Sequence, residues 1–345
     1  MLGVSSAYIM RRARLRFAGL ELEFVDREAA LRGVEELAER GTYPVYVVFG
    51  PEGCGKTAWL KQSAMLLKEL GFDVLYINPV ERELLAEVGV EDVKRGLLEI
   101  LREVTDAAWV KASWALIDVA KMLLKVGRKR LAILADDVFQ AIGLNKANIY
   151  VKGLLGLIEY PPSSYERIVA VVATGEGVSR REIGRHRWAT LRPMWNMSKE
   201  GFRELYDKIP GDKPPFEDVW RITGGNPGLL AELYKRNWDV DKLISELIRR
   251  KNIKTIVEVL TEEEKKLLAR AINYPDVLVY REGIPLANKL VELNLIVDNM
   301  YDRDPYFWVD VPPPEKDLEL GIGKEIAWQT PIYREAVKKV LQKYV

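Results

Sequence analysis

The sequence of 345 residues contains only one cysteine, Cys54, and only one histidine, His186. A single cysteine excludes an internal disulfide and a thiolate zinc cluster, and it favours a reducing compartment. A lone histidine cannot supply a zinc site built on several histidines, so we interpret His186 as structural. Any chemistry of this protein must therefore rest on other residue types.

Net charge is also nearly absent, because 52 Lys and Arg residues balance 51 Asp and Glu residues and leave +1. No overall field attracts nucleic acid or a membrane, so any such binding must be local. No apolar stretch is long enough to span a bilayer. The mildly apolar first ten residues run into Arg11, Arg12, Arg14 and Arg16, the reverse of the charge order in a signal peptide. We therefore expect a cytoplasmic protein without membrane contact.

One motif is complete: residues 50–57, GPEGCGKT, satisfy the pattern G-x-x-x-x-G-K-[ST]. They lie between the apolar run Val45–Phe49 and an amphipathic stretch that begins at Ala58, the strand-loop-helix setting of a phosphate-binding loop. Glycines let successive N–H groups point at a phosphate, and the following helix adds its positive end. The expected nucleotide contacts are Gly50, Pro51, Glu52, Gly53, Cys54, Gly55, Lys56, Thr57 and Ala58. Of these, Lys56 is expected to reach the β- and γ-phosphates and the Thr57 hydroxyl to ligate Mg²⁺.

Apolar runs alternate with helical patterns through the first half of the chain, as in a parallel sheet with crossover helices. The expected strands are Val45–Phe49, Asp73–Asn78, Leu131–Asp136, Ile168–Thr174 and Ala189–Arg192. The helix after the phosphate loop is expected over Ala58–Leu70. A second, longer helical region is expected over Glu81–Lys125, which has few helix breakers.

The second half is mostly helical. From Ser198 to Arg250 the pattern is wholly helical apart from a loop at Pro210–Pro215. Short helices follow Lys251, then aromatic and proline-rich pieces that resemble strands at Tyr306–Val311, and a final helix over Tyr333–Tyr344. This composition shift suggests that the chain changes domain class after the sheet.

Two acids, Asp136 and Asp137, end the third expected strand, Leu131–Asp136. A carboxylate at the end of a buried strand beside a phosphate loop is well placed to hold Mg²⁺ through a coordinated water, and we assign that role to Asp136. The next acid, Asp137, would orient or deprotonate the water that attacks the γ-phosphate. The alternative is that the pair simply begins a loop.

Five segments together resemble the archaeal ATPases of the STAND class, relatives of the AAA+ and origin-recognition ATPases: FVDRE at 24–28, GPEGCGKT at 50–57, LAILADD at 131–137, Gly184-Arg185, and TGGNP at 223–227. The resemblance implies an α/β P-loop NTPase with an AAA+-like parallel sheet, in which the fourth strand lies between those of the phosphate loop and LAILADD. It further implies an all-α helical lid and a C-terminal winged-helix domain. On this basis we expect the ATPase core at residues 1–195, the lid at 196–255 and the winged helix at 256–345.

The resemblance also assigns residues outside the loop. It implies that Val25 and Arg27 lie near adenine and that Pro227 touches the nucleotide from the lid, although the GGNP run is also ordinary turn chemistry. Thr174 matches a polar sensor of the γ-phosphate, with a plain strand end as the alternative. Arg185 is the arginine chosen to stabilise the transferring phosphoryl group, while a solvated surface arginine is the other interpretation.

Many relatives carry Glu where this chain has Asp137. Because Asp is one methylene shorter, the attacking water would sit differently, and slow hydrolysis is expected. That would suit a nucleotide-dependent switch better than a motor.

The C-terminal part is acidic, since residues 256–345 contain sixteen Asp and Glu residues against twelve Lys and Arg residues, a net of −4. A winged helix that reads DNA needs a basic face, and the helix expected to enter the groove, Leu286–Asn294, offers one Lys and one Glu. Packing against the core or another protein is therefore favoured over DNA binding, which stays the alternative. A small-molecule kinase is a third, weaker candidate. The aromatic residues at 301 and 306–308 are either core or a partner-binding patch.

Overall fold

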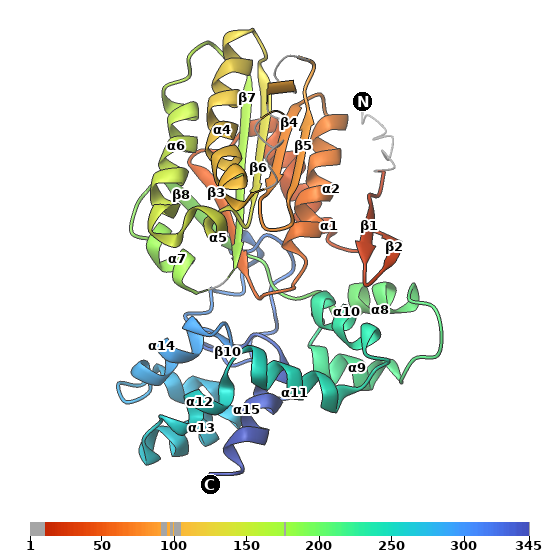
Figure 1. Ribbon diagram of the computed structural model, residues 1–345, viewed down its shortest axis with the longest axis vertical. Coiled ribbons are helices and arrows are strands. Elements are labelled where there is room, and N and C mark those ends of the chain that lie inside the picture. Colours follow the sequence, from red (N-terminus) through yellow and green to blue (C-terminus); the bar gives the residue numbers. More distant parts are fainter. Residues whose placement is uncertain (1–10, 91–94, 97–98, 100–104, 176, 345) are drawn as a thin grey trace, which may run out of the picture.

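The computed structural model describes residues 11–344 except 91–94, 97–98, 100–104 and 176. Its upper part in Figure 1 is a six-stranded sheet with the order β5-β4-β6-β7-β3-β8, parallel except for β5. Strand β7, the fourth predicted strand, lies between the phosphate-loop strand β3 and the LAILAD strand β6, so the predicted order is confirmed. The strands are β3 Val45–Gly50, β4 Asp73–Asn78, β5 Glu83–Glu87, β6 Arg130–Asp136, β7 Arg167–Gly175 and β8 Ala189–Pro193.

Helices cover both faces of this sheet, which explains why its strands are apolar almost throughout. Helices α1 (Glu28–Arg40) and α2 (Lys56–Glu69) pack on one face against residues such as Val48. Helices α4 (Asp106–Lys125) and α6 (Ala147–Glu159) pack on the other against residues such as Val47. The short helices α5 (Val138–Ile142) and α7 (Val178–Ile183) follow β6 and β7. Successive strand residues thus face opposite layers of one α/β sandwich.

The prediction of one helical region over Glu81–Lys125 is wrong at its start, because residues 83–87 form β5, antiparallel to β4. The segment ELLAE consists of good helix formers, but pairing with the edge of β4 overrides that preference. Leu84 packs toward the α4 and α6 side and Leu85 toward the α1 and α2 side, as alternation in a strand requires. Helix α4 begins only at Asp106, and part of the remaining region lies outside the described residues.

The predicted helical lid is present as four helices: α8 Lys199–Asp207, α9 Phe216–Thr223, α10 Pro227–Lys235 and α11 Val240–Arg250. The C-terminal part contains α12 Ile253–Glu258, α13 Glu262–Asn273, α14 Ile284–Glu292 and α15 Pro331–Leu341, with β9 Ile296–Val297 antiparallel to β10 Ala327–Trp328. The winged-helix prediction requires helices followed by a two-stranded ribbon, and this part of the chain contains both. One apolar cluster runs continuously from Phe202 in the lid to Val337 in α15, so the two parts pack as a unit. Among the described residues, no helix is both long and apolar enough to cross a membrane.

The connection between β9 and β10, residues 298–326, is here called the wing. Its expected strand-like stretch Tyr306–Val311 is not a strand: a single 3₁₀ turn, Pro305–Phe307, is capped by the side chain of Asp304. Prolines at 305 and 312–314 remove the N–H groups that a ladder needs. Trp308 is buried, whereas Tyr306 and Phe307 are exposed and lie near the guanidinium of Arg192.

A β-hairpin that the sequence did not predict precedes the sheet. Its strands are β1 (Arg14–Phe17) and β2 (Leu20–Glu23), joined by Ala18 and Gly19, both with positive φ. Such a two-residue turn matches the twist of a hairpin. The hairpin lies beside α2 and the lid helices α8 and α10 (Figure 1).

Candidate functional site

A cavity of about 1270 Å³ opens where β3, β6 and β7 end. Its floor is the phosphate loop, and Thr174 at the end of β7 and Asp137 after β6 border it. Pro227 and Gly228 border it from the lid, and Arg14–Ala18 from the hairpin. Of the nine predicted loop contacts, six line the cavity, namely Glu52, Gly53, Gly55, Lys56, Thr57 and Ala58. The structure therefore brings Asp137, Thr174 and Pro227 together with the phosphate loop, as the sequence suggested.

The phosphate loop has a curled backbone, with φ of +76° at Gly53 and +103° at Gly55, values that glycine adopts without strain. Helix α2 begins at Lys56, two residues earlier than predicted. The Lys56 ammonium donates hydrogen bonds to the carbonyl oxygens of Gly50 at 2.9 Å and Pro51 at 3.0 Å. Its positive charge is thus held beneath the loop, where an anion bound by the loop would meet it.

The side chain of Cys54 faces the interior of the protein. Its thiol is fully buried and lies 3.6 Å from the Met194 carbonyl oxygen. This position fits a small side chain chosen for packing, and it leaves the thiol out of reach of bulk solvent.

Asp136 is almost fully buried at the end of β6, and its Oδ2 accepts hydrogen bonds from Asn78 Nδ2 at 2.9 Å and the Tyr76 hydroxyl at 3.3 Å. Burial, together with the charge of Asp137, raises its pKa to about 6, while the Thr57 hydroxyl and Lys56 oppose that rise. A hydroxyl and a carboxylate side by side at a phosphate loop suit Mg²⁺, which takes its remaining ligands from water and phosphate. No group of three or more acidic, His or Cys side chains among the described residues forms a separate metal site.

Asp137 and Thr174 lie on the cavity wall. Asp137 has φ of 48°, in the left-handed region that non-glycine residues rarely adopt, and its Oδ1 accepts a hydrogen bond from Gln140 Nε2 at 3.1 Å. Burial raises its pKa, an effect that the charge of Lys56 reduces. Strained backbone of this kind concentrates at sites where a side chain must point in one direction. Thr174 is almost fully buried beside it in the cavity lining.

Three predicted site residues that belong neither to the phosphate loop nor to the end of β6 do not border the cavity. Val25 is buried in the apolar cluster of the lid, and Arg27 is buried in an ion pair with Asp310 of the wing. Neither lines the cavity. Arg185 is 68% exposed at its side chain, pairs only with Glu182 at 3.3 Å among the contacts described, and does not line the cavity either.

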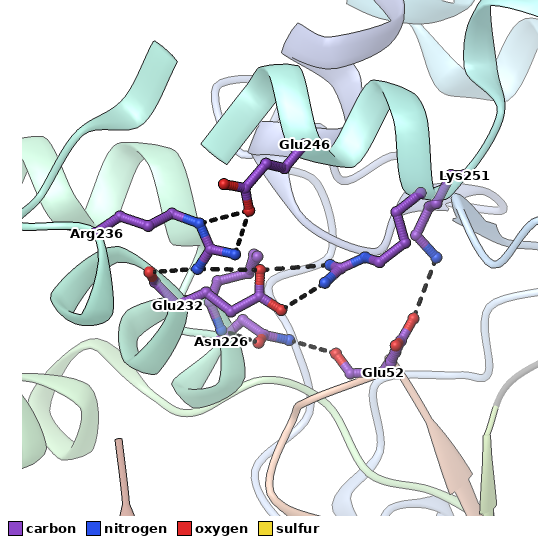
Figure 2. A network of polar contacts seen from close by, with 8 residues as sticks. Glu52, Asn226, Glu232, Arg236, Glu246 and Lys251 are labelled. Atoms are coloured by element: carbon purple, nitrogen blue, oxygen red, sulfur yellow. Dashed lines mark hydrogen bonds and ion pairs between the residues drawn. The ribbon is translucent and has the colours of Figure 1, made fainter. Parts of the chain in front are cut away.

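Glu52 of the phosphate loop is held by Asn226 of the lid and by Lys251 (Figure 2). Asn226 Nδ2 donates to the Glu52 carbonyl oxygen at 2.9 Å, and the Gly228 N–H donates to the Gly53 carbonyl oxygen at 3.0 Å. Lys251, just after α11, donates to the Glu52 carboxylate at 3.1 Å and to the Leu293 carbonyl oxygen at the end of α14, also at 3.1 Å. The loop, the lid and the C-terminal part therefore meet around Glu52.

A second set of contacts completes this junction. The Glu52 N–H donates to Gln329 Oε1 at 3.2 Å, and Asn196 Nδ2 donates to the Gln329 carbonyl oxygen at 2.8 Å. Arg27 donates to the Cys54 carbonyl oxygen at 2.6 Å. Each of these bonds would have to adjust if the loop changed shape around a ligand.

The C-terminal part also borders the cavity directly. Glu292 and Asn294, at the end of α14, are among its lining residues. A Cβ atom added at Gly177 would lie 3.2 Å from Asn294 Oδ1. The residues just after α14 therefore lie beside the loop that follows Thr174. Glu292 is an exposed residue that lines the same cavity as Thr174 and Asp137.

Sequence reasoning missed the hairpin wall, the partners of Asp136, and the residues that hold the phosphate loop. Asn78 carried a usable signal, because it is a polar residue that ends an otherwise apolar strand before Pro79. Gln329, Lys251 and Glu292 carried none, since only the tertiary structure brings them to the loop.

Comparisons with known proteins place the chain in a family. A family model described as an ATPase domain predominantly from Archaea matches residues 24–233, more than half of the chain. No curated protein matches the chain in sequence.

Several solved structures resemble the fold at low identity. A Walker-type ATPase of Pyrococcus abyssi is 16% identical, with 91% of this chain and 96% of that one covered and a TM-score of 0.47. Cdc6p of Pyrobaculum aerophilum is 14% identical, with 92% and 94% covered and a TM-score of 0.37. The Orc1 protein of Aeropyrum pernix, solved in complex with DNA, is 14% identical, with 93% of each chain covered and a TM-score of 0.38.

Such distant likenesses say nothing of what this chain binds. The family match is of another kind, because it spans the phosphate loop, the acidic strand end and the lid residues that border one cavity. The chain therefore belongs to the family of ATPase domains found predominantly in Archaea.

Proposed function

We propose that this chain is a Mg²⁺-dependent ATP-binding protein and slow ATPase that acts as a nucleotide-dependent conformational switch. The observation that carries the proposal is the junction around Glu52, where lid and C-terminal residues bond to the backbone and side chain of the phosphate loop. A ligand that reshapes this loop must disturb those bonds, and so it acts on the position of the other parts.

The residues on the cavity wall divide the chemistry of hydrolysis. Lys56 would neutralise the β- and γ-phosphates, while Thr57 and Asp136 would hold Mg²⁺, which supplies charge neutralisation at the phosphates when bound. Asp137 would orient the attacking water and accept its proton. Thr174 would hydrogen-bond the γ-phosphate or that water. The half-buried position of Asp137 and its raised pKa fit a group that takes up a proton.

Slow turnover is proposed for two reasons. The side chain of Asp137 is one methylene shorter than a Glu at this position and would reach the attacking water less easily. Its Oδ1 also accepts a hydrogen bond from Gln140, which competes with the water for the carboxylate. Arg185 lies outside the cavity, so in a single chain it would not reach the transferring phosphoryl group and would act only on the site of a second copy.

A switch needs a part that distinguishes ATP from ADP, and Glu292 is suited to that task. It lines the cavity that Thr174 and Asp137 also line, and these two residues would meet the γ-phosphate. Like charges repel, and because Glu292 is exposed, solvent keeps this repulsion modest. ATP would therefore favour displacement of the end of α14, whereas ADP, lacking the third phosphate, would tolerate the arrangement described here.

The wing is proposed to be a packing element rather than a DNA-binding one, because several of its residues contact the ATPase core. The Asp298 carboxylate accepts a hydrogen bond from Arg181 at 2.8 Å, the ring of Tyr301 meets that of Phe49 edge-on at 5.7 Å, and the Val309 N–H donates to the Pro193 carbonyl oxygen at 3.0 Å. A surface engaged in this way is closed to DNA. Tight, salt-sensitive binding of a short duplex by the full chain would instead favour an origin-recognition-like role.

The function is tested by the nucleotide affinity of two variants. Glu292→Gln removes the charge that opposes the third phosphate, and we expect its affinity for ATP relative to ADP to rise about three- to tenfold. Glu282→Gln, at an exposed residue two positions before the start of α14, makes the same charge change outside the cavity and should leave the ratio unchanged. An unchanged ratio in both variants would remove Glu292 from the account, and no binding of either nucleotide to the wild type would overturn the function itself.

A further inference from the structure

The outer wall of the nucleotide cavity is made by the β1–β2 hairpin, which precedes the segment matched by the family model. Five consecutive residues, Arg14 to Ala18, line the cavity. Since side chains alternate between the two faces of a strand, a consecutive run of lining residues means that the edge of β1 borders the cavity. Within the described part of the chain that edge pairs with no other strand, because β1 bonds only to β2 in a two-stranded sheet.

The register of the hairpin fixes which main-chain groups lie on this edge. Phe17 and Leu20 close a two-residue turn and exchange hydrogen bonds, and the pairs alternate from there. The bond from the Phe24 N–H to the Ala13 carbonyl oxygen fits the same alternation. Leu15 and Phe17 therefore direct their main-chain groups at β2, whereas Arg14 and Arg16 direct theirs away from it.

Two anchors hold this edge in place. The side chain of Gln62 in α2 bonds to both the Ala13 N–H at 2.7 Å and the Arg11 carbonyl oxygen at 2.9 Å. On the other side, Phe17, Leu20 and Leu22 pack against the apolar core of the lid. The hairpin is thus fixed between the helix that follows the phosphate loop and the lid.

We infer that the free edge of β1 binds the purine base of the nucleotide and selects adenine, an inference that rests on the proposed function. Adenine presents a donor next to an acceptor on its pairing edge, and guanine presents the reverse. The Arg14 carbonyl oxygen and the Arg16 N–H offer the complementary acceptor and donor on one edge of β1. Pro227 and Ala231 of the lid border the same cavity and supply apolar surface for the flat faces of a base.

This assignment gives the base a place that Val25 and Arg27 do not provide, since Arg27 is committed to Asp310 and neither residue lines the cavity. It also explains why a hairpin so short, with one unpaired edge, is fixed at both ends. An edge bond to a base satisfies main-chain groups that would otherwise face only water.

The test removes one main-chain donor. Arg16→Pro deletes the outward N–H without removing a bond to β2, and an edge strand tolerates proline at such a position. We expect the dissociation constant for ADP, measured by competition with a fluorescent ADP analogue, to rise about tenfold while that for GDP stays within about twofold. The matched control Glu21→Pro deletes the N–H opposite Arg16 on the edge of β2, which does not line the cavity, and should leave both constants unchanged.

A second measurement uses the unaltered chain and does not depend on the fold of a variant. Exchange of the Arg16 amide hydrogen should slow on saturation with Mg-ADP, and exchange at Glu21 should not. The inference would be overturned if Arg16→Pro preferred ADP over GDP as strongly as the wild type does. It would also be overturned if the exchange rate of the Arg16 amide were unchanged with ADP bound. Because both results presuppose that ADP binds, they leave the proposed function standing, whereas failure of the wild type to bind any nucleotide would overturn both.

Discussion

Arg27 and Asp310 form an ion pair of 2.7 Å in which each side chain is only 4% exposed. It joins the residue before α1 to the wing, 283 positions later in the chain. The same guanidinium donates to the carbonyl oxygens of Cys54 at 2.6 Å and Trp195 at 3.0 Å. One arginine thus ties the N-terminal segment, the phosphate loop, the end of the sheet and the wing together.

The first prediction concerns this pair. Asp310→Ala leaves a buried guanidinium without its counter-charge and is expected to lower the free energy of unfolding by about 3 to 5 kcal/mol. The measurement is urea denaturation. Glu315 is an exposed residue of the same wing, and Glu315→Ala should change the free energy of unfolding by less than about 0.5 kcal/mol. Equal stability of Asp310→Ala and the wild type would mean that the wing does not hold the core through this pair.

The second prediction concerns the role of Lys56 in nucleotide binding. Lys56→Ala should weaken binding of ADP and ATP about 10- to 100-fold, because a charge-assisted contact with the phosphates is lost. Lys68→Ala, an exposed substitution on the same helix, should bind as the wild type does. Titration with a fluorescent nucleotide decides the matter, and circular dichroism checks that the fold is kept. Undiminished affinity of Lys56→Ala would contradict the assignment of the phosphate loop.

The two acids at the end of β6, Asp136 and Asp137, are expected to have separable roles. Asp137→Asn should keep Mg-ATP bound but release phosphate at least about tenfold more slowly, since a positioned base typically contributes more than that. Asp136→Asn should bind ATP with much weaker dependence on Mg²⁺. Phosphate release and Mg²⁺ titrations measure the two effects. Wild-type behaviour of both variants would remove this strand end from the site.

Stability should depend on pH through Asp136. Burial raises its pKa to about 6 in the folded chain from an ordinary value of 3.8. The folded state therefore holds the proton more tightly, and this contribution to stability is present below about pH 4 and is lost as the pH rises through 6. Without metal or nucleotide, Asp136→Asn should be more stable than the wild type at pH 8, by at most about 3 kcal/mol, and nearly equal to it at pH 4. A difference that is the same at both values would contradict the pKa assignment.

The local parts of the site were predictable from the sequence, and the parts that depend on distant contacts were not. The phosphate loop and Asp136 could be placed because the signals for a turn, a helix start and an apolar strand each lie within a few neighbouring residues. Strand β5 was missed because its residues favour a helix when judged alone. Pairing with the edge of β4, which the local sequence does not reveal, makes them a strand. The hairpin and the wing contacts were missed because their partners lie on other elements.

The same division explains the residues assigned from the family resemblance. Pro227 and Thr174 reach the cavity since each ends or begins an element that points at it. Arg27 does not, because Asp310, far along the chain, engages its charge. No local pattern around FVDRE could have indicated that partner.

The proposed switch requires that the γ-phosphate alter how the C-terminal part sits on the ATPase core. Its most direct test is hydrogen exchange at the Val309 amide, which bonds to the Pro193 carbonyl oxygen across that boundary at 3.0 Å. Exchange should be measured in the full chain with saturating Mg²⁺ and either ADP or a non-hydrolysable ATP analogue. We expect the Val309 amide to exchange at least about tenfold faster with the ATP analogue than with ADP, because the third phosphate opposes the docked arrangement. Equal exchange rates in the two nucleotide states, with both shown to be bound, would contradict the account.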